Sequence, residues 1–347
     1  MSSAELICRL AAEHRLTTEE YRFLIEHRSD KTAAQLAELA SEQARAVYGN
    51  RVFVRGLIEV SSICKNDCLY CGIRKSNQNC QRYRLTPEQI LACAVEGYGL
   101  GFRTIVLQGG EDGWFTDDRL CGIVREIKAR CPDTAVTLSM GERGRESYAR
   151  LFAAGADRYL LRHETADPVH YGKLHPPSMS FEHRMNCLRD LHDIGYQTGC
   201  GFMVGSPFQT AAELAQDLKF IEEFRPEMCG IGPFIPHKDT VFRTEPAGTL
   251  ELTLFLLSVV RLIRPNILLP ATTALGTIDP MGREKGILAG ANVVMPNLSP
   301  PEVRDKYMLY DNKLRSGAEA AQNLNDLKQR MAAIGYEVVT DRGDIRR

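Results

Sequence analysis

Short apolar runs alternate with amphipathic helices from about residue 52 to residue 300, and this alternation constrains the fold more than any other feature. Apolar runs bounded by turn signals are typical of buried strands, and strands separated by helices are typical of a parallel sheet. Eight such units fit in roughly 250 residues, the usual size of a complete (β/α)8 barrel of the TIM type, an α/β fold. A doubly wound open sheet is the alternative. The predicted strands are residues 53–60, 104–108, 135–139, 158–162, 198–204, 228–231, 267–270 and 292–295.

The segments on either side of this region are helical in pattern. Residues 1–50 contain a capping box at Thr17 and Glu20 and a further helix that begins at Asp30, which predicts an N-terminal helical extension. Residues 301–347 read as a loop and one or two helices, the clearest at 318–335, and we expect them to pack on the barrel. We therefore predict an extension at 1–50, a barrel at 51–300 and a C-terminal segment at 301–347.

Composition excludes several classes of function. The formal net charge of −1 gives no basic field for nucleic acid and no polybasic patch for a membrane surface. The N-terminal residues have no apolar core like that of a signal peptide, and the most apolar run, 250–263, is too short to cross a bilayer. An odd number of cysteines, eleven, without an export signal predicts a reducing, cytoplasmic location. Chemistry on a small molecule is favoured.

Three of the cysteines are clustered. Cys64, Cys68 and Cys71 follow the first predicted strand at the spacing C-x3-C-x2-C, with Tyr70 directly before the last of them. Three thiolates on one short loop surround a metal centre but leave it one ligand short, so the site can bind something else. Zinc would require a fourth ligand, and the next sulfur is nine residues away at Cys80. Inert thiols and a disulfide both fit poorly on a polar loop in a chain without an export signal.

Polar residues stand where predicted strands end, at the mouth at which such barrels keep their chemistry. Arg162 and Glu164 follow the fourth strand and are suited to an anion and to ribose hydroxyls, with an internal salt bridge as the alternative. The other candidates are a Gln-Gly-Gly-Glu turn, an arginine on a helix, two threonines after the seventh strand, and two tyrosines at helical spacing in the C-terminal segment. They are Gln108, Gly109, Gly110, Glu111, Arg184, Thr272, Thr273, Tyr307 and Tyr310.

The cysteine spacing resembles the signature of the radical SAM superfamily, and longer strings make the chain similar to the HydE family of [FeFe]-hydrogenase maturases. The cysteines of that signature hold three irons of a [4Fe–4S] cluster, and S-adenosylmethionine (SAM) chelates the fourth. The Gly109-Gly110-Glu111 turn resembles the motif that binds the SAM amino group. The strings are RYRLT at 82–86, LQGGED at 107–112, RYLLRHET at 158–165, GIGPFIPH at 230–237, PATTA at 270–274 and GANVVMPN at 290–297.

The resemblance implies roles for individual residues. Cys64, Cys68 and Cys71 would ligate the cluster, and Glu164 and Arg184 would hold SAM. We assign Met203 and Met295 to the SAM site as well, with a core position as the alternative for Met295. An internal cavity for a small anionic or organometallic substrate would be lined by Gln108, Thr137, Arg162, Thr272, Thr273, Tyr310 and Tyr307.

One departure concerns a second cluster. Some members of the family carry three more cysteines near the C-terminus, but this chain has no cysteine after Cys229. We therefore predict a single cluster.

The resemblance also implies the activity. A reduced cluster would cleave SAM to a 5′-deoxyadenosyl radical that acts on a cysteine-bound iron carbonyl cyanide precursor during assembly of the two-iron subcluster. The expected partners are other hydrogenase maturases and an electron donor. Two different functions stay open at this point: a radical SAM mutase or lyase on an amino acid, similar to methylornithine synthase, and a non-catalytic iron–sulfur scaffold.

Overall fold

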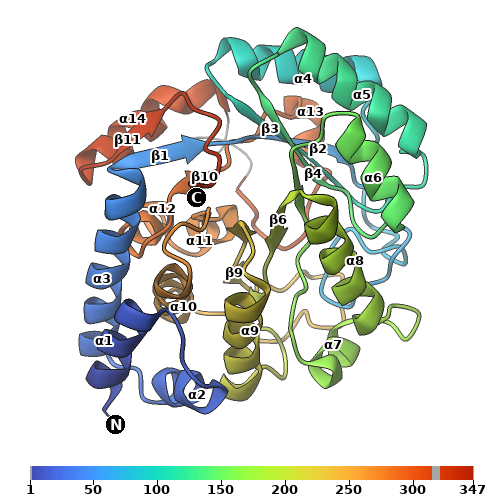
Figure 1. Cartoon of the computed structure of the whole chain (residues 1–347). Coiled ribbons are helices and arrows are strands. Elements are labelled where there is room, and N and C mark those ends of the chain that lie inside the picture. The colour runs from blue at the N-terminus through green and yellow to red at the C-terminus, as the bar shows by residue number, and fades with distance from the viewer. Residues whose placement is uncertain (1, 315–320, 347) are drawn as a thin grey trace.

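A parallel sheet with helices on its outer side forms the centre of the computed structural model, which describes residues 2–314 and 321–346 (Figure 1). Its six strands are hydrogen-bonded in the order β2-β3-β4-β5-β6-β8, and every pair is parallel. All six lie in the chain order of the predicted strands. Their bounds are β2 Gly56–Ser61, β3 Thr104–Gly109, β4 Ala135–Ser139, β5 Arg158–Leu160, β6 Gln197–Cys200 and β8 Met228–Cys229.

Two smaller sheets flank this one. β1 (Arg51–Val54) lies between β10 (Val293–Val294) and β11 (Glu337–Val339), and β7 (Met203–Val204) pairs with β9 (Gly232–Pro233). The predicted first strand is thus divided at Arg55, because β1 pairs with β10 and β11 whereas β2 pairs with β3. The prediction that only a loop and helices follow residue 300 was wrong, because β11, in the C-terminal segment, is a strand that pairs with β1.

The seventh predicted strand is held by single bridges. Leu268 bridges Met228, and Pro270 bridges Val293, so residues 267–270 connect β8 to β10 without forming a ladder. The predicted parallel α/β fold is confirmed. The hydrogen-bonded ladders do not run continuously through all eight positions, so closure into a complete barrel stays a prediction.

Helices cover the outer side of the sheet between successive strands (Figure 1). Several begin as their sequences predict: Thr86 and Thr210 cap α4 and α9 with their side chains, and Pro87 occupies the first helical position of α4. The helices are α4 Pro87–Gly99, α5 Asp117–Arg130, α6 Arg145–Ala153, α7 Pro168–Leu174, α8 Phe181–Ile194, α9 Ala211–Phe224, α10 Leu250–Ile263, α11 Thr273–Ile278, α12 Gly282–Leu288, α13 Pro301–Arg304 and α14 Leu324–Ala333.

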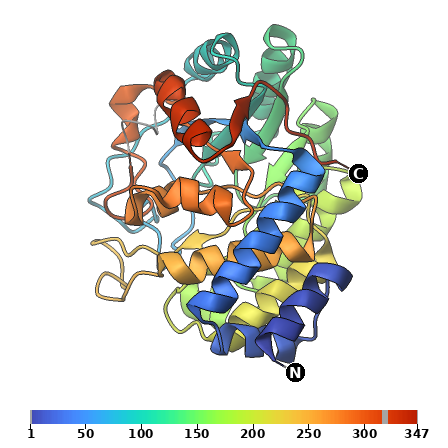
Figure 2. The same cartoon turned by 90° about the vertical axis from the view of Figure 1, so that its left-hand side faces the viewer.

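The N-terminal residues form three helices, α1 (Ser3–Glu13), α2 (Thr18–Glu26) and α3 (Asp30–Tyr48), which pack against α9 and α10 (Figure 2). The predicted capping box at Thr17 and Glu20 begins α2. Of the predicted helix 318–335, residues 318–320 lie outside the described residues, and η2 (Ala321–Asn323) and α14 occupy most of the rest. The predicted boundaries at residues 50 and 300 stay predictions. No helix in the described part of the chain has the length and apolarity that a membrane span requires.

Candidate functional site

The cysteine loop follows β2 and is tied to three other parts of the fold. Lys65 N donates to Glu111 O at 3.0 Å, Leu69 N to Leu174 O at 3.0 Å, and Gly72 N to Leu309 O at 2.8 Å. These bonds join the loop to the turn after β3, to the end of α7 and to the C-terminal segment. The positions of the cysteines are therefore set by backbone contacts from both sides of the loop.

All three cysteines are free and half-buried. Burial raises the pKa of each thiol, that of Cys71 to about 12. The thiols are therefore neutral at ordinary pH, and a metal centre that binds them must displace their protons. Among the described residues no three Cys, His, Asp or Glu side chains converge on the position of a single ion. A structural zinc site takes four protein ligands, and this loop supplies three cysteines, whereas cysteines of an iron–sulfur cluster ligate different irons. The donor set fits a cluster better than zinc.

The turn after β3 lies directly against the cysteine loop. A Cβ atom added to Gly110 would lie 2.3 Å from Ile63 O and 2.8 Å from Cys64 Cβ, so only glycine fits there. Glu111, next in the chain, accepts from Glu142 N at 3.0 Å and forms an ion pair with Lys65 Nζ at 3.0 Å. Two predicted features, the cysteine loop and the glycine turn, are thereby brought together.

Arg184 projects from α8 toward the strand ends and is buried. Its Nε donates to Glu142 Oε1 at 2.5 Å, and its Nη1 donates to Arg162 O at 2.6 Å. Glu142, in the loop after β4, thus connects Glu111 to Arg184. Sequence reasoning missed Glu142, although a charged residue after a predicted strand was the same signal that drew attention to Arg162 and Glu164.

Glu164 has a strained backbone. Its φ of +67° is in the left-handed region that glycine prefers, and its N donates to Gly201 O at 3.0 Å. The side chain forms an ion pair with Arg162 at 3.0 Å, the salt bridge that the sequence had left open. The two atoms of this contact, Glu164 Oε2 and Arg162 Nη2, are buried and have no further hydrogen-bond partner in the described structure. The pair therefore keeps hydrogen-bonding capacity for a ligand.

Other predicted cavity residues share this property. The Thr137 and Thr272 hydroxyls and Arg162 Nε are buried and have no hydrogen-bond partner within the described residues. Gln108 lies near Tyr307, whose phenol is buried and has its pKa raised, first by burial. Thr273 begins α11, and Tyr310 lies in the C-terminal segment. For these seven residues, lining of a common cavity stays a prediction.

The predicted methionines lie in apolar surroundings. Met203, on β7, packs with Leu174, Phe234 and Phe242, and Leu69 and Tyr70 of the cysteine loop join that cluster. Met295 packs beside Met228 and Val293. Met203 therefore packs in the same apolar group as Tyr70, the residue before Cys71. Met295 lies in core surroundings, which was the alternative to its place in the SAM site.

A buried ion pair joins the C-terminal segment to β2. Lys313 Nζ donates to Glu59 Oε1, and Asn297 Nδ2 donates to Glu59 Oε2 at 3.0 Å. The Lys313 ammonium also lies 4.9 Å from the centre of the Tyr307 ring. The sequence did not indicate this pair, because its members are 254 residues apart.

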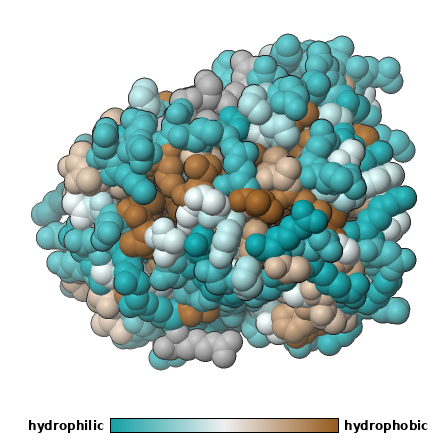
Figure 3. Space-filling model, turned by 90° about the horizontal axis from the view of Figure 1, so that it is seen from above, coloured by the Kyte–Doolittle hydropathy of each residue, from teal (hydrophilic) through white to brown (hydrophobic). Residues whose placement is uncertain are grey.

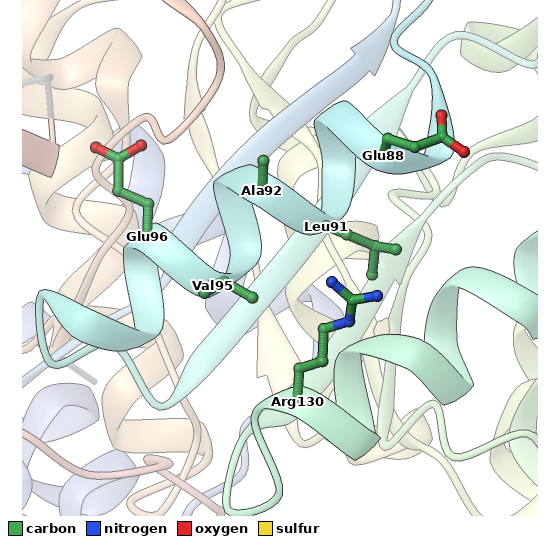
Figure 4. A pocket seen from close by; sticks show the side chains of 6 residues that line it. All are labelled: Glu88, Leu91, Ala92, Val95, Glu96 and Arg130. Carbon is green, nitrogen blue, oxygen red and sulfur yellow. The ribbon is translucent and has the colours of Figure 1, made fainter.

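Two pockets open on the surface. One of about 490 Å³ lies on the outside of α4 and α5 and is lined by Leu91, Val95 and Arg130 among others (Figure 4). Apolar side chains are interspersed among hydrophilic ones on the face seen from above (Figure 3). No predicted site residue lines the pocket on α4 and α5. The second, of about 430 Å³, is lined by His237, Lys238, Met308, Asp311 and Asn312, beside the cysteine loop.

Comparison with known proteins agrees with this geometry. The Radical SAM superfamily model matches residues 58–221. The [FeFe] hydrogenase maturase subunit HydE of Thermotoga maritima is 50% identical over 279 residues, which cover 80% of this chain and 79% of that protein. The chain belongs to the HydE family. It is therefore a radical SAM enzyme of [FeFe]-hydrogenase maturation, and membership of the superfamily implies a [4Fe–4S] cluster and SAM.

Methylornithine synthases share the architecture of this HydE-family chain. The 3-methylornithine synthase of Methanosarcina acetivorans is 27% identical over 93% of this chain and 90% of its own length. The crystal structure of methylornithine synthase (PylB) superposes with a TM-score of 0.83 at 26% identity, covering 96% of this chain and 97% of that one. The fold is thus common to both families. The higher sequence identity to HydE, 50% against 27%, places this chain in the HydE family.

Proposed function

We propose that Cys64, Cys68 and Cys71 hold one [4Fe–4S] cluster whose open iron binds SAM. The support is the geometry of the loop, which backbone bonds hold in place and whose Cys64 lies against Gly110. When bound and reduced by one electron, the cluster supplies the cleavage of SAM to methionine and a 5′-deoxyadenosyl radical. The part of the protein is to bind, orient and shield the reacting groups.

We assign the SAM-binding roles to residues at the ends of β3 to β5. Gly109 and Gly110 let the backbone approach the amino group, and Glu111 supplies a carboxylate beside it. Arg184, held by Glu142, presents a fixed guanidinium to the SAM carboxylate. Glu164 accepts from the ribose hydroxyls. Met203 and Met295 contact the adenosyl part.

The substrate class follows from the unpartnered donors. Arg162 Nε, the Thr137 hydroxyl and the Thr272 hydroxyl are buried without partners in the described structure. Buried polar groups are nearly always hydrogen-bonded, so these donors are suited to an anionic ligand. A cysteine-bound iron carbonyl cyanide complex, delivered by another hydrogenase maturase, has this character. Gln108, Thr273, Tyr307 and Tyr310 complete the proposed cavity.

The buried, unpartnered Arg162 Nε, Thr137 hydroxyl and Thr272 hydroxyl carry this proposal, because all three belong to residues assigned to the cavity from sequence. Anaerobic protein reconstituted with iron and sulfide should contain about four irons per chain if it holds a single cluster. Its electron paramagnetic resonance spectrum in the reduced state should change when SAM is added. Eight irons per chain would contradict the single cluster.

Two activity measurements separate the candidate functions. Formation of 5′-deoxyadenosine from SAM with dithionite as reductant distinguishes an enzyme from a scaffold. Activation of apo-hydrogenase together with the other maturases distinguishes a HydE function from an amino-acid mutase. Formation of methylornithine from lysine, without hydrogenase activation, would contradict the proposed function.

A further inference from the structure

The most exposed large apolar side chains of the described residues lie on neighbouring segments. Val169 is 68% exposed, Phe208 56% and Val241 53%. The Phe208 ring is 6.1 Å from the Phe242 ring, next in the chain to Val241. Lys173 Nζ lies 5.4 Å from the Phe208 ring, and Val169 precedes Lys173 by one turn of α7. These side chains therefore form one patch.

Phe208 is held outward by a strained backbone. Its φ of +66° is a left-handed conformation, which is unfavourable for a residue with a Cβ. An aromatic ring that is both strained and exposed does nothing for the packing of the core. Unlike His14 and Arg225, whose left-handed backbones end α1 and α9, Phe208 does not end a helix.

Three cations lie on the same segments as these apolar side chains. Lys173, Lys238 and Arg243 are exposed, and none forms an ion pair with an acid in residues 2–314 and 321–346. The acids of the same loop, Asp239 and Glu245, are half-buried, and Asp239 accepts a hydrogen bond from Asn79. The patch thus presents a small apolar centre with a positively charged margin. We define the 208 patch as Val169, Lys173, Phe208, Lys238, Val241 and Arg243.

The 208 patch is continuous with the cysteine loop. A Cβ on Gly72, the residue after Cys71, would lie 2.4 Å from His237 Cδ2, and Asn79 Nδ2 donates to Asp239 Oδ1 at 2.9 Å. Beneath the patch, Phe242 packs with the apolar cluster that Leu69 and Tyr70 join. The loop between β9 and α10 projects from the body on the same side as the cysteine loop (Figure 2). A protein bound at the patch would lie next to the proposed cluster.

We propose that the 208 patch is the docking surface for an acidic one-electron carrier protein. This inference rests on the proposed function, in which the cluster accepts one electron from outside the chain while the carrier is oxidised by one electron. Redox complexes are small and transient, with an apolar centre and a charged margin that steers encounter. The 208 patch has this pattern of apolar and charged side chains.

The test uses an acidic flavodoxin in its hydroquinone form as the probe. Charge reversal in Lys173→Glu/Arg243→Glu should lower flavodoxin-driven 5′-deoxyadenosine formation about tenfold or more at low salt, and high salt should reduce the difference. The rate with dithionite should stay within about twofold, because dithionite needs no docking surface. Lys31→Glu/Lys328→Glu makes the same change of charge on exposed residues of α3 and α14 and should change neither rate.

Calorimetric titration of the holoprotein with flavodoxin tests the patch independently of turnover. Weaker binding by Lys173→Glu/Arg243→Glu, with unchanged binding by Lys31→Glu/Lys328→Glu, supports the docking surface even where no 5′-deoxyadenosine forms. Absence of 5′-deoxyadenosine with dithionite in the wild type contradicts the proposed function alone. Equal flavodoxin binding by all variants overturns the inference. The inference is also overturned if Lys173→Glu/Arg243→Glu binds flavodoxin as the wild type does but no longer activates hydrogenase with dithionite as reductant. That result would assign the patch to binding of another maturase.

Discussion

Arg184 Nε donates to Glu142 Oε1 at 2.5 Å, and this bond joins α8 to the loop after β4. Because Arg184 Nη1 also donates to Arg162 O at 2.6 Å, the guanidinium is fixed from two sides before any ligand binds. The protein has thus ordered the side chain that we assign to the SAM carboxylate. A preordered guanidinium binds a carboxylate without a further loss of side-chain entropy.

Glu142→Ala should weaken SAM binding by roughly tenfold or more, because a hydrogen bond to a charged group is worth about 1.5–3 kcal/mol. Glu142→Gln keeps an acceptor for Arg184 and should retain most of the affinity. Equilibrium binding of SAM to the reconstituted protein measures both. Glu182→Ala, on the exposed first turn of the same helix, is the matched control. Equal affinity of Glu142→Ala and the wild type would exclude this positioning role.

The unpartnered threonines predict a separation of stability from activity. Thr137→Val and Thr272→Val remove hydroxyls that have no partner in the described structure, so thermal stability of the ligand-free protein should be unchanged or higher. Hydrogenase activation should fall if the hydroxyls bind the substrate. In Thr104, by contrast, the hydroxyl donates to Arg342 O at 2.8 Å and accepts from Arg158 Nη1 at 2.9 Å. Thr104→Val should destabilise by about 1–3 kcal/mol. Full activity in both site variants would refute their assignment.

Lys313→Met should destabilise the protein by about 3–5 kcal/mol, because it leaves Glu59 buried without a counter-charge. The cost should be largely recovered in Glu59→Gln/Lys313→Met, which removes both charges. Denaturant unfolding of the three proteins gives the comparison. A single variant as stable as the wild type would show that the ion pair does not anchor the C-terminal segment.

His175 predicts a pH dependence of stability. Burial lowers its pKa to about 3, whereas an unfolded histidine has a pKa of about 6.5. Between these values the unfolded chain binds one more proton than the folded chain, so the free energy of unfolding should rise with pH up to about 6.5 and then level off. The contribution to the slope approaches about 1.4 kcal/mol per pH unit.

His175→Gln should reduce this slope between pH 4 and 6.5, as measured by denaturant unfolding at several pH values. His192→Gln changes an exposed histidine on α8 and serves as the control. An unchanged slope in His175→Gln would show that His175 does not titrate in this way.

Local patterns determined much of the fold and part of the site. Capping boxes at Thr17, Thr86 and Thr210 set helix starts, because the bonds they form span only a few residues. Alternating apolar runs predicted the parallel strands in their order, and the cysteine spacing located the loop. Each of these signals is complete within a short stretch of chain.

The tertiary structure alone decided which distant groups meet. β11 is three residues long and carries no periodic pattern, so only its pairing with β1 defines it as a strand. The bond between Glu142 and Arg184 and the buried pair of Glu59 and Lys313 depend on how separate loops are brought together. Sequence specified the chemical groups because they are local, and the fold specified their partners because charge and hydrogen bonding act through space.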